Sequence, residues 1–314
     1  MSHGDDDALA APIEVIDLII DAAAPEKADA WRRLRDGLSI SFHPVEDRKG
    51  VTMHARGRRV EFDAKTMAWI WLLGFTAWHA FRLHGPHLFW RVLTGRQIDA
   101  ALRSNDGGYA AAEGDYEALL YAMRDFHALQ VFDLSDDWPA GVPQPQKDKA
   151  GFDIEQQAAF DLTMIATAYV LLHEVKHVEF NAAGSRPTRP EEEFACDAFA
   201  RHFILDDAAD YAAEASSAAD DVIGKRAAGI AIGIYILYAF TPSGGRAGSA
   251  EYPPVAERIE ALFPDVRLAD DHWFWDFAAS LLIALIVSQD RSATIPELDG
   301  APLAHALVQM LRGS

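Results

Sequence analysis

The sequence predicts a mainly α-helical α+β protein with a small β-sheet near its N-terminus. Residues 38–63 contain segments in which polar and apolar side chains alternate with the period of a strand, as in Leu38-Ser39-Ile40-Ser41-Phe42. From Ala64 onward, long apolar segments follow one another with helical character. The chain is 50% hydrophobic and 24% charged, which is the balance of a globular protein.

Local patterns predict each element in turn. Residues 12–23 predict a short helix, and Val60-Glu61-Phe62-Asp63 predicts a strand that follows a turn at Arg56-Gly57. The Gly/Asp-rich residues 104–115 and the Pro-rich residues 135–150 predict loops. Further helices are expected over residues 153–181, from Pro190 through 195–214 without a break, and over 220–240, 253–263, 272–289 and 302–312.

The overall charge limits the classes of partner. The chain has 28 Lys and Arg residues against 48 Asp and Glu residues, a formal net charge of -20. Binding to nucleic acid requires clustered positive charge, so we expect no nucleic-acid partner. An anionic membrane surface should also repel this chain.

The cysteine content and the N-terminal residues indicate the cellular compartment of the protein. Cys196 is the single cysteine, so no internal disulfide can form, which fits a reducing compartment. The first residues, Met-Ser-His-Gly-Asp-Asp-Asp, lack the basic and apolar stretches of a secretory signal. We therefore expect a cytoplasmic protein.

Three apolar runs, residues 66–81, 227–240 and 277–288, are candidate membrane spans. Each is shorter than the roughly 20 residues that a span needs, so we expect buried helices of a large core. A membrane-associated form that uses the first two runs remains the alternative.

The sequence His173-Glu174-Val175-Lys176-His177 is the central chemical feature. On a helix, the two histidines lie one turn apart on the same face and can reach one metal ion. Glu174 lies beside them and can accept a proton from metal-bound water. Because the pattern fixes only three positions, two histidines buried in a helical core are the competing interpretation.

A second helix supplies candidates for the remaining ligand. Thr188 and Glu191 have the spacing of a capping box, and Pro190 suits a first helical turn, so a helix begins here. Glu193 is the expected third ligand, with Glu192 in reserve. The alternative for these acids is a favourable interaction with the helix dipole.

Asp197, further along the same helix, completes the expected site. Asp197 lies one turn beyond Glu193 and should accept the free ring N–H of a ligating histidine, which we expect to be His173. Cys196 is expected to point elsewhere and to be a small packed residue. The sequence thus predicts one Zn2+ per chain, although manganese or iron stays open.

The pattern His173-Glu174-x-x-His177 followed by Glu193-x-x-x-Asp197 resembles the gluzincin metallopeptidases. Tyr252-Pro253-Pro254-x-x-x-Arg258-Ile259 is similar to a His-Pro-Pro-x-x-x-Arg-Ile segment of membrane metallopeptidases related to the CAAX prenyl protease. The short gap between the two motifs resembles the Lit-type phage-exclusion peptidases. The resemblance covers residues 160–262 and implies zinc, a helical catalytic core and hydrolysis of a peptide bond in a peptide or protein substrate. Lys176, Glu179 and Tyr252 depart from the usual pattern.

We therefore expect a zinc-dependent endopeptidase with Glu174 as general base. Tyr252, Arg258 and His272 are candidates for stabilising the oxyanion, and Tyr252 is the one that we place among the catalytic residues. A substrate strand is expected along residues 50–63. Besides a membrane-associated metallopeptidase, a non-catalytic helical protein that binds zinc or a partner is the alternative.

The chain is expected to form a single metallopeptidase domain over residues 1–314, with residues 1–63 as an N-terminal strand-containing portion and 150–290 as the catalytic helical core. Three further histidines, His79, His84 and His87, have no carboxylate partner at a convincing spacing, and we expect them to be structural.

Overall fold

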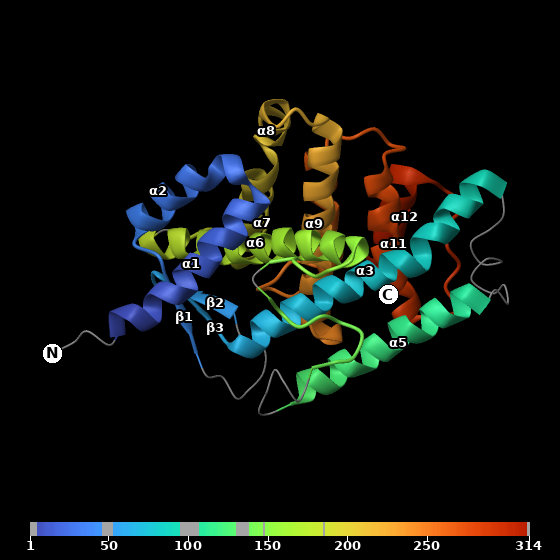
Figure 1. Ribbon diagram of the computed structural model, residues 1–314, viewed down its shortest axis with the longest axis horizontal. Helices are drawn as coiled ribbons and strands as arrows, with labels where there is room; N and C mark the ends of the chain where they lie inside the picture. The colour runs from blue at the N-terminus through green and yellow to red at the C-terminus, as the bar shows by residue number, and fades with distance from the viewer. Residues whose placement is uncertain are drawn as a thin grey trace.

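The structure is a computed structural model that describes residues 5–45, 53–94, 107–129, 138–146, 148–184 and 186–312. Its described elements are mainly helices, and the three strands all lie in the N-terminal part of the chain (Figure 1). The predicted fold class, mainly helical α+β with a small N-terminal sheet, is confirmed.

The long helices form the body of the molecule. They are α1 (Asp5–Ala23), α2 (Ala28–Leu38), α3 (Ala64–Thr94), α5 (Gly107–Ala128), α6 (Ile154–Ala183), α7 (Arg189–Leu205), α9 (Ala219–Phe240), α11 (Trp273–Gln289) and α12 (Gly300–Arg312). The shorter helices are η1 (Pro25–Lys27), α8 (Ala208–Glu214), η2 (Ser243–Gly245), α10 (Val255–Glu260) and η3 (Phe263–Asp265).

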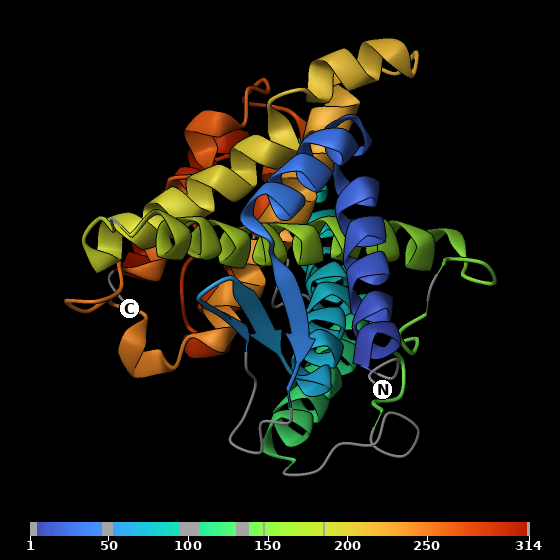
Figure 2. The same ribbon diagram turned by 90° about the vertical axis from the view of Figure 1, so that its left-hand side faces the viewer.

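Helix α6 runs through the centre of the molecule (Figures 1 and 2). It contacts α1, α3, α7 and α9. Its sequence is apolar on nearly every side, and fourteen of its side chains are buried, which is the pattern of a helix enclosed by others. The motif-bearing helix is therefore the core helix of the fold.

Two glycines let α9 approach α6 closely. A Cβ atom on Gly229 would lie 2.5 Å from the Ile165 side chain, and one on Gly233 would lie 2.6 Å from the Tyr169 ring. Distances under 3 Å are not compatible with real side chains, so glycine is required for this packing. The same helix α9 then carries Ile236 and Leu237 to the cavity beside α6.

The sheet has the strand order β1 (Ser41–Pro44), β3 (Arg59–Phe62), β2 (Met53–Arg56). Strand β1 is parallel to β3, and β2 is antiparallel to β3 through a turn at Gly57, whose φ of +62° suits glycine. Strand β2 is an edge strand and contacts α6 (Figure 2). Strand β2 therefore places an edge of the sheet, with no further strand on it among the described residues, beside the central helix.

Several predicted boundaries differ from the structure. Helix α5 begins at Gly107, so the loop predicted over 104–115 is wrong for residues 107–115, where Ala110-Ala111-Ala112 favours helix despite the glycines. The helix predicted over 195–214 breaks between α7 and α8 at Asp206-Asp207. Helix α2 was not predicted.

The remaining boundaries agree more closely. The predicted helices over 153–181, 220–240, 272–289 and 302–312 are confirmed within one or two residues at most ends, while the helix predicted over 253–263 is the shorter α10. The predicted loop at 135–150 has no helix or strand in its described part, residues 138–146 and 148–150.

Two helices are long and apolar enough to cross a membrane by length and composition, at Ile154–Ala183 and Ala219–Ala239. Other helices cover most of each apolar window, which is 67% buried in the first and 72% buried in the second. Core helices of soluble proteins meet the same criterion, so these lengths are weak evidence for a membrane span.

Candidate metal centre

Helix α6 holds the two histidines on the side that faces α7. It begins at a capping box in which Asp153 accepts a hydrogen bond from the backbone of Gln156, and it ends at Gly184 in the left-handed conformation. His173 and His177 are one turn apart, and their ring centroids are 4.9 Å from each other. The predicted helical context of the motif is confirmed.

Helix α7 begins where its sequence predicts. The Glu191 carboxylate accepts hydrogen bonds from the Thr188 backbone N–H at 3.0 Å and from the Thr188 hydroxyl at 2.7 Å. This cap fixes the direction of α7 against α6. As a consequence, four residues in two successive turns of α7 are buried on the side of the histidines: Glu192, Glu193, Cys196 and Asp197.

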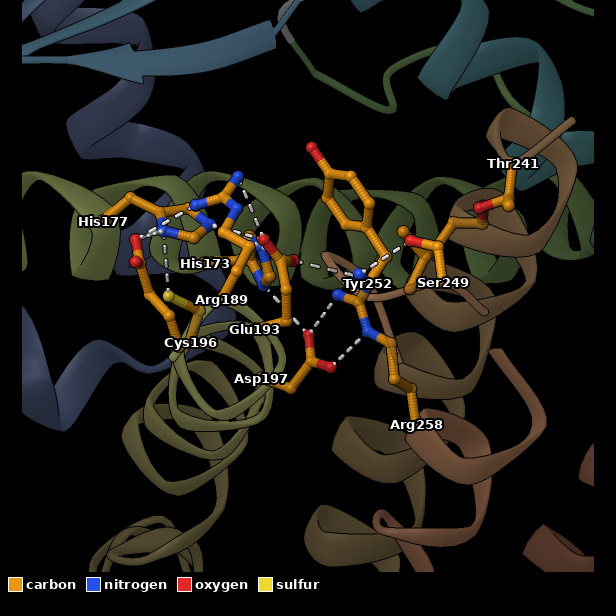
Figure 3. Close-up of polar contacts among 12 residues, drawn as sticks. His173, His177, Arg189, Glu193, Cys196, Asp197, Thr241, Ser249, Tyr252 and Arg258 are labelled. Carbon is orange, nitrogen blue, oxygen red and sulfur yellow. Dashed lines mark hydrogen bonds and ion pairs between the residues drawn. The ribbon is translucent and has the colours of Figure 1, made fainter. Parts of the chain in front are cut away.

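Three side chains direct potential ligand atoms toward one point (Figure 3). The Nε2 atoms of His173 and His177 are 3.2 Å apart. One Glu193 oxygen lies 3.4 Å from His173 Nε2, and the other lies 3.5 Å from His177 Nε2. Ligand atoms around a tetrahedral zinc ion with bonds of 2.0–2.1 Å are about 3.3 Å apart. The three side chains therefore have the spacing of a three-ligand zinc site.

The outer nitrogen of each ring faces a carboxylate. His173 Nδ1 lies 2.9 Å from an Asp197 oxygen, and His177 Nδ1 lies 2.7 Å from a Glu192 oxygen. A carboxylate accepts hydrogen bonds, so each Nδ1 carries the proton and each Nε2 presents a lone pair. Two lone pairs at 3.2 Å repel each other unless a cation lies between them. The donor set therefore fits a metal ion.

Carboxylates around the imidazole rings stabilise positive charge at the centre. Burial lowers the pKa of His173, but hydrogen bonds to Asp197 and Glu193 outweigh this effect and raise that pKa to about 9. Burial would raise the pKa of Glu193, yet its contacts with the histidines hold that pKa well below the usual range. In the absence of a metal, His173 therefore holds a proton near Glu193, and a metal ion competes with that proton for the same site.

Asp197 is at the centre of a buried network behind His173. Arg258 of α10 donates to both Asp197 oxygens, at 2.6 Å from Nε and 2.8 Å from Nη2. The Tyr169 hydroxyl donates to the same carboxylate at 3.0 Å. Burial acts to raise the pKa of Asp197, but Arg258 and His173 keep it well below its usual range. Asp197 thus remains an anion that can orient His173.

Glu174 lies beside the ligands and contacts the edge strand. Its carboxylate accepts a hydrogen bond from the backbone N–H of Ala55 in β2, and removal from water raises its pKa above the usual range. A carboxylate whose pKa moves toward neutrality is suited to accept and release a proton. The edge of the sheet and the central helix therefore meet at this residue.

A cavity of about 540 Å³ opens over the centre. Its lining brings together the residues predicted as a site, which are His173, Glu174, His177, Glu193, Asp197 and Tyr252. Tyr252 is 46% exposed, and its ring lies under the Arg189 guanidinium at 5.4 Å. His272 does not line this cavity, because it caps α11 and accepts a hydrogen bond from the Phe274 backbone at 3.2 Å.

Cys196 lies against the centre, so the expectation that it points elsewhere is wrong. Its Sγ atom is 3.4 Å from His177 Nδ1, and it forms a candidate metal-binding group with the two histidines. However, the thiol faces the outer nitrogen of His177, which is already hydrogen-bonded to Glu192. Burial and nearby carboxylates raise the pKa of Cys196 far above its usual range, so the thiol keeps its proton. Glu193 therefore has the better geometry for the third ligand.

Three contacts of the site were not predicted from the sequence. Tyr169 precedes His173 by one helical turn, which is a signal for a shared face. Arg189 precedes Glu192 and Glu193 by three and four residues and pairs with them at 3.1 and 3.2 Å. Ala55 has no signal in the sequence, since it acts through its backbone.

The three other histidines lie outside this centre. His84 is 3% exposed, and burial lowers its pKa to about 3, as expected for a neutral core residue. Burial also lowers the pKa of His79. Neither lines the cavity over the metal centre, and the same is true of His87.

Comparison with known proteins agrees with a peptidase. A family model described as peptidase U49 matches residues 60–278, which is well over half of the chain and includes His173, Glu174, His177, Glu193 and Asp197. Neither the curated proteins nor the solved structures include a match to this chain. The extent of the family match decides the classification: the chain belongs to the peptidase U49 family.

Proposed function

We propose that this protein is a zinc-dependent endopeptidase of the gluzincin type, close to the Lit-type peptidases. The convergence of His173, His177 and Glu193 on one point, at 3.2 to 3.5 Å between their ligand atoms, carries the proposal. These three residues would hold one Zn2+ per chain and leave its fourth position open. Membership of a peptidase family supports the choice of reaction.

The bound zinc ion would polarise the scissile carbonyl and lower the pKa of water toward neutrality. Glu174 is the proposed general base. Its carboxylate takes a proton from the attacking water and later passes that proton to the leaving amine. The raised pKa of Glu174 and its position in the cavity lining support this role.

Tyr252 is the proposed donor to the oxyanion. It lines the cavity, its ring is nearly half exposed, and Arg189 both packs over the ring and donates a hydrogen bond to its hydroxyl. Arg258 is less suited to this role because it is 5% exposed and its guanidinium is engaged by Asp197 and Glu193. We assign Arg258 the positioning of Asp197 and, through it, of His173.

The edge of β2 is the proposed binding surface for an extended substrate. Met53, His54 and Ala55 line the cavity, and β2 has no strand partner on the side away from β3 among the described residues. An extended peptide can add to such an edge through backbone hydrogen bonds. Glu174, hydrogen-bonded to Ala55, lies at the same edge.

We also propose a cytoplasmic location and a single domain for the enzyme. The single buried cysteine fits a cytoplasmic protein. We propose one metallopeptidase domain over residues 1–314, because the sheet joins β1, outside the family match, to β3, of which residues 60–62 lie within the match.

Replacement of Glu174 tests the reaction. Purified protein loaded with zinc would be incubated with a mixed library of internally quenched hexapeptides. We expect Glu174→Gln to lower the cleavage rate at least about a hundredfold, since a positioned base contributes this much or more. Zinc content should stay at one ion per chain. Glu179→Gln is the matched control, because Glu179 is on the same helix and pairs with Lys176. Undiminished cleavage by Glu174→Gln would remove it as the base.

A further inference from the structure

The cavity over the metal centre differs in character from one end to the other. Its floor is one stripe of α6 that includes Val170, His173, His177 and Asn181, spaced three or four residues apart. Val170 and Asn181 are separated by about 16 Å along the helix. That length equals about five residues of extended peptide. A bound segment would therefore reach both ends with its middle at the metal ligands.

One end of this cavity is apolar. Val170 of α6 and Leu237 of α9 lie there, and both are partly exposed. The buried Ile236 of α9 also lines this part of the cavity. Such a surface favours an aliphatic or aromatic side chain, because binding removes apolar area from water. The apolar end begins one turn before His173.

The opposite end is rich in hydrogen-bond donors. Asn181 follows His177 by one turn, and Arg186 and Arg189 lie in and after the connection from α6 to α7. Arg189 is already paired with Glu192 and Glu193. Arg186 is exposed and pairs with no carboxylate among the described residues. Arg186 is therefore the cation at this end that stays available.

The charges that line the cavity also favour binding of an anionic group. Four carboxylates line it, and each has a partner or a proposed role: Glu174, Glu192, Glu193 and Asp197. Three arginines line it as well. With a divalent ion held by the ligands, positive charges outnumber negative charges by one. This local excess contrasts with the net charge of -20 for the whole chain.

We propose that the Arg186 end is a subsite for a carboxylate of the substrate, so that the preferred substrate carries an acidic group on one side of the scissile bond and an apolar side chain on the other. This inference rests on the proposed peptidase function. An arginine guanidinium binds a carboxylate with two parallel hydrogen bonds, which a neutral amide cannot match. The carboxylate could come from an Asp or Glu side chain or from the C-terminus of a peptide, and the test separates these sources.

Binding to an inactive protein tests the subsite without depending on cleavage. The zinc-loaded Glu174→Gln protein would be titrated with fluorescent hexapeptides that carry an acetyl and an amide cap, with Leu at one end and Glu, Gln or Lys at the other, in both orientations. A Gln peptide with a free C-terminal carboxylate completes the set. We expect one Glu peptide or the free-carboxylate peptide to bind about tenfold more tightly than the capped Gln peptide.

Charge reversal provides the specific readout. In the same background, Arg186→Gln should reduce the preference for the carboxylate to less than about twofold, and Arg186→Glu should transfer the preference to the Lys peptide. Arg33→Gln is the matched control, because Arg33 is exposed on α2 and does not line the cavity. Equal binding of the Glu, the free-carboxylate and the capped Gln peptides, or no binding of any peptide, would overturn the subsite. Cleavage of both peptides by the unmutated protein would still leave the peptidase proposal standing. A carboxylate preference without any cleavage would support the subsite and count against the peptidase.

Discussion

At the scale of single residues, the arrangement of the two imidazole rings determines what the centre can bind. Each ring gives its outer N–H to a carboxylate, His173 to Asp197 and His177 to Glu192. The inner nitrogens are left to share one cation with Glu193. Because each orienting carboxylate is on α7, the ligands and the groups that orient them are held by the same pair of helices.

Replacement of Cys196 distinguishes the two candidates for the third ligand. We expect Cys196→Ala to keep one zinc ion per chain, because the thiol faces the outer nitrogen of His177 rather than the point where the ligands converge. Removing the buried sulfur atom leaves a small cavity, so the free energy of unfolding of Cys196→Ala should fall by about 1 kcal/mol. Metal analysis checks the first expectation, and chemical denaturation checks the second. Loss of zinc in Cys196→Ala would make Cys196 a ligand.

Replacement of Arg258 tests whether it acts through Asp197. Lysine cannot reproduce the two-pronged contact with Asp197, so Arg258→Lys should loosen the orientation of His173 and weaken zinc binding about 10- to 100-fold. Competition with a chromophoric chelator measures this change. Arg201→Lys is the control, because Arg201 is equally buried and pairs with Asp265 away from the centre. If the two variants bind zinc equally well, Arg258 has no positioning role.

The residues of the site differ in how far sequence spacing could predict them. Helix geometry predicts that His173 and His177 share one face, because they are one turn apart. The same spacing places Glu193 and Asp197 on one face of the second helix. Arg258 is 61 residues from Asp197, and only the fold brings them together. Spacing also misplaced Cys196, because the face of α7 that contacts α6 is broad enough to include the residue next to Asp197.

At the scale of elements, the close contact between α6 and α9 supports the cavity. Gly229→Leu would place a side chain where Ile165 already lies 2.5 Å from the added Cβ atom. We expect this overpacking to lower the free energy of unfolding by about 1–3 kcal/mol. Gly37→Ala is the control, since a Cβ at Gly37 meets nothing within 4 Å, and it should stabilise the protein by about 0.5 kcal/mol. Urea denaturation measures the free energy of unfolding of both variants. An unchanged free energy of unfolding in Gly229→Leu would contradict the tight contact between α6 and α9.

Element types followed the sequence pattern, but some boundaries did not. Long apolar segments predicted α6, α9 and α11 because each segment is longer than a typical strand. The start of α5 was missed because three glycines and two acids lie within residues 107–115, a composition typical of a loop, although α5 packs on α3. The break between α7 and α8 depends on where the chain turns, which two aspartates indicate weakly.

At the scale of the whole molecule, a buried ion pair ties the N-terminal portion to the helical core. Arg226 of α9 donates to both oxygens of Glu26, at 2.5 and 2.8 Å, and also to the Ile204 carbonyl at 2.7 Å. The two residues are 200 positions apart. This contact joins η1, which precedes the family match, to a helix within it. It is consistent with one domain over the whole chain.

Replacement of the ion pair tests whether the N-terminal portion and the helical core unfold as one domain. Arg226→Leu leaves the Glu26 carboxylate without its partner, and we expect a loss of about 3–5 kcal/mol in the free energy of unfolding. Glu26→Leu combined with Arg226→Leu should cost less than the sum of the two single changes. Denaturation followed by both fluorescence and circular dichroism should show one coincident transition. Two separated transitions would contradict a single domain.

The metal content of the purified protein tests the central claim most directly. After exposure to zinc and removal of the excess, we expect about one zinc ion per chain in the unmutated protein by inductively coupled plasma mass spectrometry. His177→Ala and Glu193→Gln should each lose most of that zinc, because each removes one of three converging ligands. Absence of zinc from the unmutated protein, or its full retention in both variants, would contradict the proposed metal centre.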